Sequence, residues 1–389
     1  MKTKKNSGKI TSDEALKLWT QAGGRCEYPG CNEYLLQDRL TGKAFNFGEM
    51  AHNVGRKKTA GSPRGINLLP VAQRSKADNH LLLCAKHHKL IDTAKFLEFY
   101  SPEELRRYKE EHESRIKYLS GLNDSRKSVV LRMMNRIHSD PVSVSNEEIV
   151  EALWSCANRY PYYLLKDHSN IEIDLSDMPD THDYAYWKTA MHRIDEVIDQ
   201  QVKPQVRKLI NHVSIFAIAP IPLMIYLGAK LGDKVRMDVY QKQYNAEEDW
   251  VWCKGSKIVT FQHNKIQEKS DKAKVAMLLS ISGKISMDSL PKQIRQDYTL
   301  YELQPKNYSP NRDLVHNKQT LVNYKKAYNE LLREVESNFS LAKEVLIFPA
   351  IPISVSIYCG RNILKAVSPK FIIYENVKRK FQKAIAIKL

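Results

Sequence analysis

The sequence is poor in the features that mark several large classes of protein. It has six Cys in 389 residues, too few for a disulfide scaffold. Residues 1–10 are charged and contain no apolar segment, so we expect no secretory signal. The longest apolar stretch, 213–229, contains Pro220 and Pro222 and is too short and too interrupted to span a bilayer. We therefore expect a cytoplasmic protein that does not enter a membrane.

Acidic residues are also in deficit. The chain has 61 Lys and Arg against 44 Asp and Glu, a net charge of +17. This excess favours a polyanionic partner such as nucleic acid, a nucleotide or an acidic membrane. A protein that is merely basic and soluble is the alternative. Apolar residues make up 42% of the chain and charged residues 27%, as is typical of folded domains.

The length is sufficient for two or three domains. A helix begins at the cap Ser101 with Pro102 after it, and should run to about Ser120. The Gly-Leu-Asn-Asp-Ser segment that follows is typical of a loop. A capping box at Ser145 opens the next helix. We expect a first domain over 1–122, a linker over 123–145 and a second domain over 146–389.

The second domain contains an internal repeat. The segment VSIFAIAPIPLMIYLG from Val213 matches VLIFPAIPISVSIYCG from Val345 at eight of sixteen positions without gaps. Each copy predicts a buried strand, a Pro-containing turn and an apolar helix, followed by a second short strand. We infer two Rossmann-like α/β lobes, about 146–270 and 271–389, with ligands at the carboxyl ends of the strands.

Two close pairs of metal-ligand residues lie in the first domain. Cys26 and Cys31 are separated by four residues, and Cys84 and His87 by two. Two such pairs supply the four ligands of a closed, structural zinc site. His88 could exchange roles with its neighbour, but His87 completes the two-residue spacing and is preferred.

Three further residues extend this pattern. His52 ends a β-like run, Asn79 precedes a short apolar run, and His88 opens a helix-compatible segment. The stretches EMAH, ending at His52, and NHLLLCAKHHKLID, beginning at Asn79, resemble the HNH nuclease family with its α+β, ββα-metal fold. The resemblance covers about residues 25–92.

This resemblance implies roles in phosphodiester hydrolysis. His52 would be the general base, His88 would bind a catalytic divalent ion such as Mg²⁺, and Asn79 would hold the loop that carries the base. Many family members have an Asp metal ligand directly before the first His, where this sequence has Ala51. Glu49 has the same strand parity and could serve instead, or it could be a supporting or plain surface carboxylate.

Basic residues around this stretch favour contact with DNA phosphates, although isolated basic residues are usually solvated. We find no element suited to reading bases, so we expect cleavage of double-stranded DNA with little sequence specificity. The candidate DNA-binding residues are Arg56, Lys57, Lys58, Arg64, Arg74 and Lys76.

The repeated half carries a second resemblance. Its segments SIFAIAPIPLMIYLGAKLGD, VYQ, WVW, LIFPAIPIS and YE are similar to SAVED domains over about 146–389. Such domains consist of two fused CARF-like lobes that bind cyclic oligonucleotides. Together the two halves resemble the bacterial HNH–SAVED effector nucleases of CBASS antiphage systems. In that family a cyclic trinucleotide or similar messenger drives oligomerisation of the effector and DNA degradation.

A cyclic oligonucleotide offers phosphates and flat bases. Phosphates favour backbone N–H groups at helix N-termini after the Pro turns, and bases favour aromatic faces. Lys230 and Arg361 could pair with phosphates or lie along apolar surface, and the two Trp are about equally suited to a core. The candidate ligand-binding residues are Pro220, Ile221, Pro222, Lys230, Tyr240, Gln241, Trp250, Trp252, Pro349, Ala350, Pro352, Ser354, Arg361 and Tyr374.

The sequence thus predicts a metal-dependent DNA endonuclease that is activated by a cyclic oligonucleotide. One alternative is a restriction-type HNH endonuclease whose C-terminal half recognises DNA sequence or modification. Another is a sensor with an inactive nuclease fold. The duplicated strands favour the first hypothesis, and the presence of His52, Asn79 and His88 argues against the last.

Overall fold

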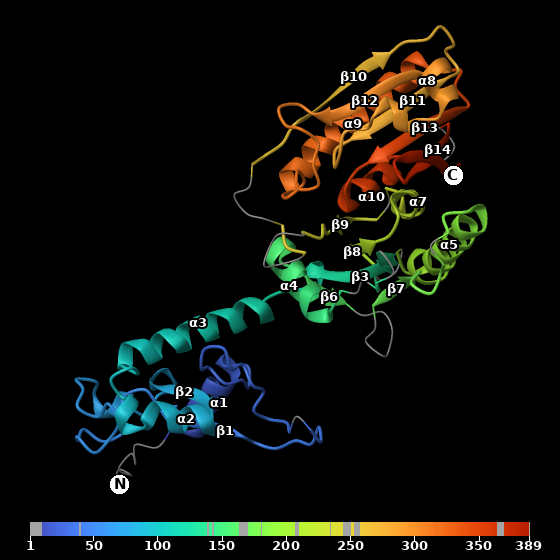
Figure 1. The fold of residues 1–389 in the computed structure, drawn as a ribbon. Helices are drawn as coiled ribbons and strands as arrows, with labels where there is room; N and C mark the ends of the chain where they lie inside the picture. The colour runs from blue at the N-terminus through green and yellow to red at the C-terminus, as the bar shows by residue number, and fades with distance from the viewer. Residues whose placement is uncertain are drawn as a thin grey trace. The chain divides into compact units, whose positions relative to one another are not determined.

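The computed structural model divides the chain into two compact units, Met1–Asn123 (unit 1) and Asp124–Leu389 (unit 2), whose elements are labelled in Figure 1. In the part of the chain that it describes, no helix is long and apolar enough to cross a membrane. The described residues are 10–38, 40–137, 140–141, 144–162, 170–179, 181–206, 210–233, 235–243, 250–252, 257–363 and 369–388.

Unit 1 is organised around a two-stranded antiparallel sheet in which His52 of β1 lies opposite His80 of β2. Every residue of β2 is buried, and α2 follows it directly, so the predicted strand–strand–helix succession is present. The last helix, α3, is capped by Ser101 with Pro102 in its first turn, as predicted. The elements are α1 (Ser12–Gln21), β1 (Gly48–His52), η1 (Val71–Gln73), η2 (Ala77–Asn79), β2 (His80–Cys84), α2 (Ala85–Asp92), η3 (Ala94–Phe96) and α3 (Pro102–Ser120).

The first lobe of unit 2 (lobe 1) is a parallel sheet with the strand order β6-β3-β8-β9, and β7 also pairs with β3. Its helix α4 is capped by Ser145, and both hydrogen bonds of the predicted capping box are present. The elements are η4 (Asp124–Arg126), β3 (Lys127–Met134), β4 (Arg136–Ile137), β5 (Asp140–Pro141), α4 (Asn146–Ala157), β6 (Tyr160–Tyr162), β7 (Ile171–Asp174), α5 (Tyr184–Val197), η5 (Ile198–Val202), α6 (Lys203–Val206), β8 (Val213–Ile218), α7 (Ile221–Leu231) and β9 (Met237–Val239).

The prediction of a linker over 123–145 was wrong. Residues 127–134 of that segment form β3, whose neighbours on its two sides are β8 and the pair β6 and β7. Its side chains are mostly buried because helices cover both faces of a parallel sheet. Lobe 1 therefore begins about twenty residues earlier than predicted. Residues 138–139 and 142–143 of the expected linker lie outside the described residues.

The second lobe of unit 2 (lobe 2) is a six-stranded sheet in the order β10-β12-β11-β13-β14-β15, with antiparallel strands at both edges. Because β10 ends at Gln267, the boundary between the lobes lies before residue 261 and not at 270 as predicted. The elements are β10 (Phe261–Gln267), β11 (Val275–Ser280), η6 (Met287–Ser289), α8 (Lys292–Asp297), β12 (Thr299–Pro305), α9 (Lys318–Asn338), β13 (Glu344–Ala350), α10 (Ile353–Arg361), β14 (Lys370–Val377) and β15 (Lys380–Ile387).

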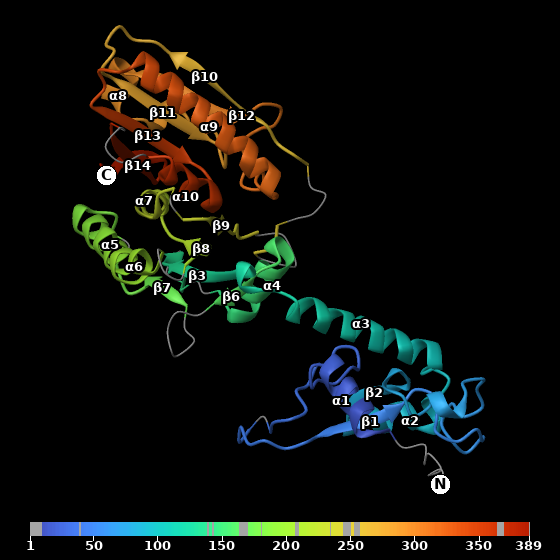
Figure 2. The same cartoon turned by 180° about the vertical axis from the view of Figure 1, so that it is seen from behind.

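Helices cover both faces of this sheet. Val275 and Met277 of β11 pack into the main core with α9 and α10, whereas Ala276 and Leu278 pack into a second cluster with Ile294 of α8. Figures 1 and 2 show α9 lying along the sheet on one side. The alternation explains why β11 is apolar throughout, since each of its faces meets a helix layer.

The sequence repeat is also a repeat in space. Helix α7 of lobe 1 crosses α10 of lobe 2 where Gly228 meets Gly360. A Cβ atom on Gly228 would lie 1.9 Å from the carbonyl oxygen of Ile357, and one on Gly360 would lie 1.7 Å from that of Ile225. Gly228 and Gly360 occupy equivalent positions in the repeat, and so do Ile225 and Ile357. Each copy of the repeat therefore makes the same contact with the other copy. The two lobes therefore meet across a pseudo-twofold helix pair.

Candidate functional site

The two predicted pairs of metal ligands come together in unit 1. The ligand atoms of Cys26, Cys31, Cys84 and His87 all lie within 4.8 Å of one another. Nδ1 of His87 lies 3.2 Å from Sγ of Cys84 and 3.6 Å from Sγ of Cys26. Three thiols and one imidazole at such separations fit the ligand shell of a tetrahedral zinc ion.

The surroundings of His87 suit a metal ligand. Its ring stacks on Tyr28 at a centroid distance of 4.1 Å, and burial lowers its pKa, which favours the neutral imidazole that binds metals. His88 does not join this cluster. Among the described residues, no second group of three or more His, Cys, Asp or Glu is arranged to hold a metal ion in this way.

His52 lies at the end of β1 with its ring 4.2 Å from that of His80. Burial and the neighbouring His80 lower the pKa of His52 to about 4, so its imidazole is neutral near pH 7. Its Nε2 atom is buried and has no hydrogen-bond partner among the described residues. A neutral imidazole with an uncommitted nitrogen is able to accept a proton.

Asn79 is buried and fastens the chain that follows His52. Its backbone carbonyl accepts from the N–H of Asn53, and its side-chain oxygen accepts from the N–H of Val54 at 2.9 Å. Its side-chain amide donates to the carbonyl oxygens of Val54 and Arg74. These bonds are the loop-holding contacts that the HNH resemblance implied for this residue.

His88 lies between two carboxylates. Its Nδ1 is 2.5 Å from Oε2 of Glu49, and its Nε2 is 3.4 Å from Oδ2 of Asp92, one helical turn later on α2. The contact with Asp92, followed by that with Glu49, raises the pKa of His88 against the opposing effect of burial. The sequence prediction had omitted Asp92, although its i, i+4 spacing from His88 was visible.

Arg64 joins the two halves of this cluster. Its Nη2 donates both to the carbonyl oxygen of His52 at 3.1 Å and to Oδ1 of Asp92 at 2.5 Å. Its other nitrogens donate to the carbonyl oxygens of Asn53 and Ile91. Only 4% of its side chain is exposed, so its assignment to DNA contact was wrong. It positions His52 and Asp92 instead.

Arg74 is a second correction. It is 1% exposed, and its guanidinium donates to four carbonyl oxygens, those of Gly55, Gly65, Asn67 and Leu69. Its side chain therefore lies at the centre of the loop between β1 and η2 and does not face solvent.

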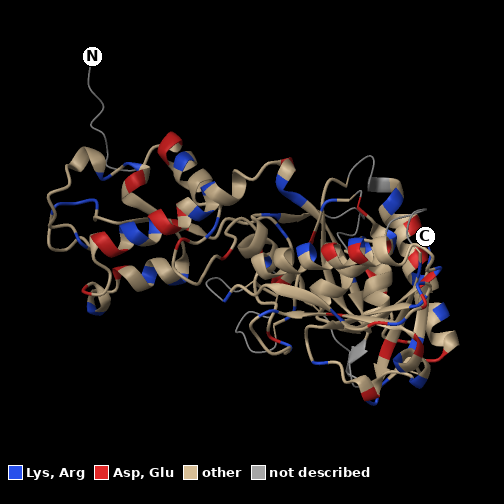
Figure 3. Ribbon diagram, turned by 90° about the horizontal axis from the view of Figure 1, so that it is seen from above, with Lys and Arg blue, Asp and Glu red and all other residues tan. Residues whose placement is uncertain are grey.

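The other predicted DNA-binding cations lie at the surface. Arg56, Lys57 and Lys58 are exposed, and Lys76 is half-exposed beside Glu14 at 2.9 Å. Elsewhere Lys and Arg are interspersed with Asp and Glu in both units (Figure 3). Arg56, Lys57 and Lys58 are thus placed to meet a polyanion, whereas Lys76 is already paired with Glu14.

In unit 2, a cavity of about 340 Å³ lies at the carboxyl edge of the lobe 2 sheet. It opens between β11 and β13, where the strand order reverses, which is the usual ligand position in such sheets. Four predicted residues line it, namely Ile221, Gln241, Ala350 and Pro352. The prediction missed the remaining lining residues, which are Met224, Ser282, Gly283, Arg312, Ile351 and Ile353.

One predicted phosphate site is already occupied. The N–H and hydroxyl of Ser354 both donate to Oε1 of Gln241 at 3.0 Å, so the first turn of α10 is capped by the end of lobe 1. Pro220 caps α7, and Pro222 and Pro349 are buried in α7 and β13. None of these three Pro lines the cavity.

The predicted base-stacking aromatics belong to the core. Tyr240 is fully buried and stacks on Phe216 at 4.5 Å, and Trp250 packs edge-on against the same ring. Trp252 is also buried. For these three residues the ligand-binding prediction was wrong. The repeat makes an equivalent pair in lobe 2, where the half-buried Tyr374 stacks on Phe348.

The two predicted phosphate-binding cations have internal partners. Lys230 forms an ion pair with Asp195 at 2.8 Å and lies over the ring of Tyr226. Arg361 donates to the carbonyl oxygens of Asp233 and Val235. Neither residue lines the cavity at the carboxyl edge.

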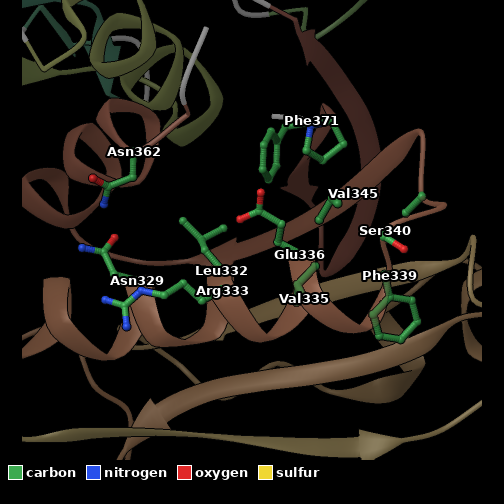
Figure 4. Close-up of a pocket in the computed structure, with 12 residues that line it drawn as sticks. Asn329, Leu332, Arg333, Val335, Glu336, Phe339, Ser340, Val345, Asn362 and Phe371 are labelled. Carbon is green, nitrogen blue, oxygen red and sulfur yellow. The ribbon is translucent and has the colours of Figure 1, made fainter. Parts of the chain in front are cut away.

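A larger cavity of about 600 Å³ lies elsewhere in lobe 2 (Figure 4). Leu332 and Glu336 of α9 border it, together with Val345 and Phe371 near the amino ends of β13 and β14. It is therefore at the edge of the sheet opposite to the one where ligands usually bind. No predicted ligand-binding residue lines it.

Comparison with known proteins identifies one family. The SAVED family model, the SMODS-associated and fused to various effectors sensor domain, matches residues 194–387. No curated protein matches this chain.

Solved structures that align with this chain include two Cap4 SAVED/CARF-domain containing receptors. That of Acinetobacter baumannii with 2′3′3′-cAAA aligns at TM-score 0.46 and 11% identity, over 78% of this chain and 62% of that one. That of Moraxella osloensis aligns at TM-score 0.38 and 12% identity, over 82% of this chain and 70% of that one. The chain thus spans less than two thirds of the first receptor. Residues 194–387 are thus the part of this chain that is similar to the SAVED sensor domain.

Proposed function

We propose that this protein is a metal-dependent endonuclease of double-stranded DNA that a cyclic oligonucleotide activates. The observation that carries the proposal is the joining of two modules in one chain. Unit 1 has His52, Asn79 and His88 on a strand–strand–helix beside a Cys₃His cluster. Unit 2 contains the SAVED sensor domain.

The chemistry assigned to unit 1 is hydrolysis of a phosphodiester. Neutral His52 accepts a proton from the attacking water, and its low pKa keeps it unprotonated at neutral pH. Asn79 holds the backbone after His52 at a fixed place, and Arg64 ties the His52 carbonyl to Asp92. The proton acceptor and the carboxylates are therefore parts of one rigid assembly.

Two metal sites are proposed. Cys26, Cys31, Cys84 and His87 would hold a structural zinc ion, since their separations suit it. His88, through Nδ1, and Glu49 would hold a divalent ion such as Mg²⁺, and Asp92, at the other ring nitrogen, would orient the imidazole. When bound there, such an ion supplies positive charge that stabilises the developing charge on the phosphate and on the leaving oxygen.

The sensor role is assigned to the cavity at the carboxyl edge of lobe 2. Arg312 and the backbone around Gly283 lie on its wall, and Ile221 and Gln241 from lobe 1 complete it. Residues of both lobes therefore meet any ligand that enters. Related receptors have been solved with the cyclic trinucleotides 2′3′3′-cAAA and 3′3′3′-cAAA, so we assign a cyclic trinucleotide to this site. The response is oligomerisation and DNA degradation in antiphage defence.

The test combines single substitutions with a plasmid-cleavage assay in Mg²⁺ and an activating cyclic trinucleotide. His52→Ala should slow cleavage by roughly 10²–10⁴-fold, the usual contribution of a general base. Glu49→Gln should lower the apparent affinity for Mg²⁺. Glu98→Gln, an exposed carboxylate of the same unit, is the matched control and should leave both properties unchanged. If His52→Ala cuts as fast as the unaltered protein, the assignment of the base is incorrect.

A restriction-type enzyme would behave differently in the same assay. It would cut foreign DNA without any nucleotide, and its activity would follow DNA sequence or modification. Cleavage that is equal with and without every cyclic oligonucleotide would favour that function over the proposed one.

A further inference from the structure

The segment that follows His52 in unit 1 has an unusual composition. From Ala51 to Ala77 it contains six Lys or Arg and no Asp or Glu. Two of these cations, Arg64 and Arg74, are buried and structural. Arg56, Lys57 and Lys58 are exposed and have no carboxylate within their own segment. The loop therefore presents a positive surface directly after the proposed base.

The shape of this loop is fixed from inside. Arg74 donates to four of its carbonyl oxygens, and each of the three guanidinium nitrogens makes at least one of these bonds. A Cβ atom on Gly55 would lie 2.3 Å from the carbonyl oxygen of Pro63, and one on Gly65 would lie 2.5 Å from that of Lys57. Such close backbone approaches leave little freedom, so the loop is a preformed surface.

The tip of this rigid loop is aliphatic. The carbonyls that Arg74 binds include those of Gly65, Asn67 and Leu69, which alternate along the chain. The residues between them, Ile66 and Leu68, are 78% and 93% exposed. A partner that covers these two side chains removes apolar surface from water without having to order the backbone that carries them.

The tip also lies close in the chain to the proposed cleavage site. Arg64, two residues before Ile66, donates to the carbonyl oxygen of His52. The backbone that carries the aliphatic tip is therefore anchored to the residue that would activate water. A partner that contacts the tip therefore contacts the same loop that is bonded to His52.

We propose that this loop, residues 53–76, docks on duplex DNA and inserts Ile66 and Leu68 between base pairs beside the phosphodiester that is cut. Arg56, Lys57 and Lys58 contact the flanking phosphates, and the aliphatic pair partly unstacks one base step. Such wedges depend on the ease of deforming DNA and not on its base edges, so they permit cleavage at many sequences. The inference rests on the proposed nuclease function and identifies how unit 1 holds its substrate.

The test uses the full chain carrying His52→Ala, so that DNA is bound but not cut. A 30-base-pair duplex with 2-aminopurine at single positions reports unstacking by fluorescence, and anisotropy reports affinity, each with and without 3′3′3′-cAAA. In this background Ile66→Ser with Leu68→Ser should weaken binding by roughly tenfold or more and abolish the fluorescence rise, without changing the salt dependence. Lys57→Ala with Lys58→Ala should weaken binding and reduce the salt slope by about two.

The matched control is Leu16→Ser with Leu40→Ser, which removes two aliphatic side chains of similar exposure, 68% and 94%, elsewhere in unit 1. It should leave both signals unchanged. The proposal is overturned if the Ile66 and Leu68 substitutions leave DNA binding intact, or alter only self-association in sedimentation. Cleavage by the protein with His52 intact, without any rise in 2-aminopurine fluorescence, also overturns it. If the protein with His52 intact binds and unstacks DNA but does not cut it, the docking loop is supported and the nuclease function is refuted.

Discussion

The contact between α7 and α10 leads to a sharp expectation about stability. Gly to Ala within a helix normally stabilises by up to about 1 kcal/mol, because Ala has the higher helix propensity. At Gly228 and Gly360 the opposite should hold. The added methyl group would face a backbone carbonyl of the partner helix at 1.9 Å and 1.7 Å, respectively.

The size of the effect follows from the geometry. Restoring a separation of 3.0 Å requires the helices to move apart by about 1.1 Å at Gly228 and 1.3 Å at Gly360. Because the obstacle is backbone, side-chain rotation gives no relief, and we expect a loss of about 3 kcal/mol or more. For a unit of this size that corresponds to a fall in Tm of roughly 6–12 °C.

Differential scanning calorimetry of the full chain measures this directly. Gly228→Ala and Gly360→Ala should each lower the transition of unit 2 and leave that of unit 1 in place. Gly283→Ala is the control within unit 2, because nothing lies within 4 Å of its added Cβ, and its Tm should stay within about 1 °C of the original. A melt of Gly360→Ala at or above the Tm of the unaltered protein would refute the reasoning about the helix pair.

Three further expectations concern metal, positioning and pH. Removal of zinc by a chelator, or Cys84→Ser, should lower the Tm of unit 1 and leave that of unit 2 unchanged in calorimetry, because the four ligands belong to unit 1; an unchanged unit 1 melt would contradict the zinc site. Arg64→Lys keeps the charge but replaces three donor nitrogens, which bond His52, Asn53, Ile91 and Asp92, with one, so both the cleavage rate and unit 1 stability should fall, the latter by roughly 2–4 kcal/mol. The contacts of Asp238 with His212 and Lys318 outweigh its burial and lower its pKa to about 2. Its contribution of roughly 2 kcal/mol is complete above the unfolded pKa of 3.8 and is lost as the pH falls toward 2, so Asp238→Asn should flatten the acid unfolding curve of unit 2 in that range.

Local patterns in the sequence were enough to predict several parts of the structure. The spacing of Cys26, Cys31, Cys84 and His87 predicted a four-residue cluster, and the structure brings these residues together. The repeat predicted two equivalent strand–turn–helix units, which are present as β8 with α7 and β13 with α10. These features depend on residues close in the chain or on identical segments, so sequence carries them directly.

The errors arose where burial decides the role of a residue. Arg64 and Arg74 have the composition of surface cations, but a loop rich in inward-facing carbonyls turns them into internal donors. Tyr240 and Trp250 have the composition of base-stacking residues, but Phe216 already stacks with them. Neither outcome is encoded in local spacing, because both depend on which segments pack together.

Strand β3 is a different kind of error. The apolar run from Val129 to Met134 was visible, and it is typical of a central parallel strand. It falls within the predicted linker because the Gly-Leu-Asn-Asp-Ser loop lies only three residues before it. The loop was a true boundary, but the next domain begins within it, at Asp124.

The most direct test of the central claim is the rate of plasmid cleavage in Mg²⁺ with and without added cyclic oligonucleotides. The panel contains cyclic dinucleotides and the trinucleotides 2′3′3′-cAAA and 3′3′3′-cAAA. We expect negligible cleavage by the protein alone, and rapid, sequence-tolerant degradation of supercoiled and linear DNA with at least one trinucleotide. The His52→Ala protein should bind the same ligand and remain inactive. Equal cleavage with and without every ligand, or none under any condition, would contradict the account.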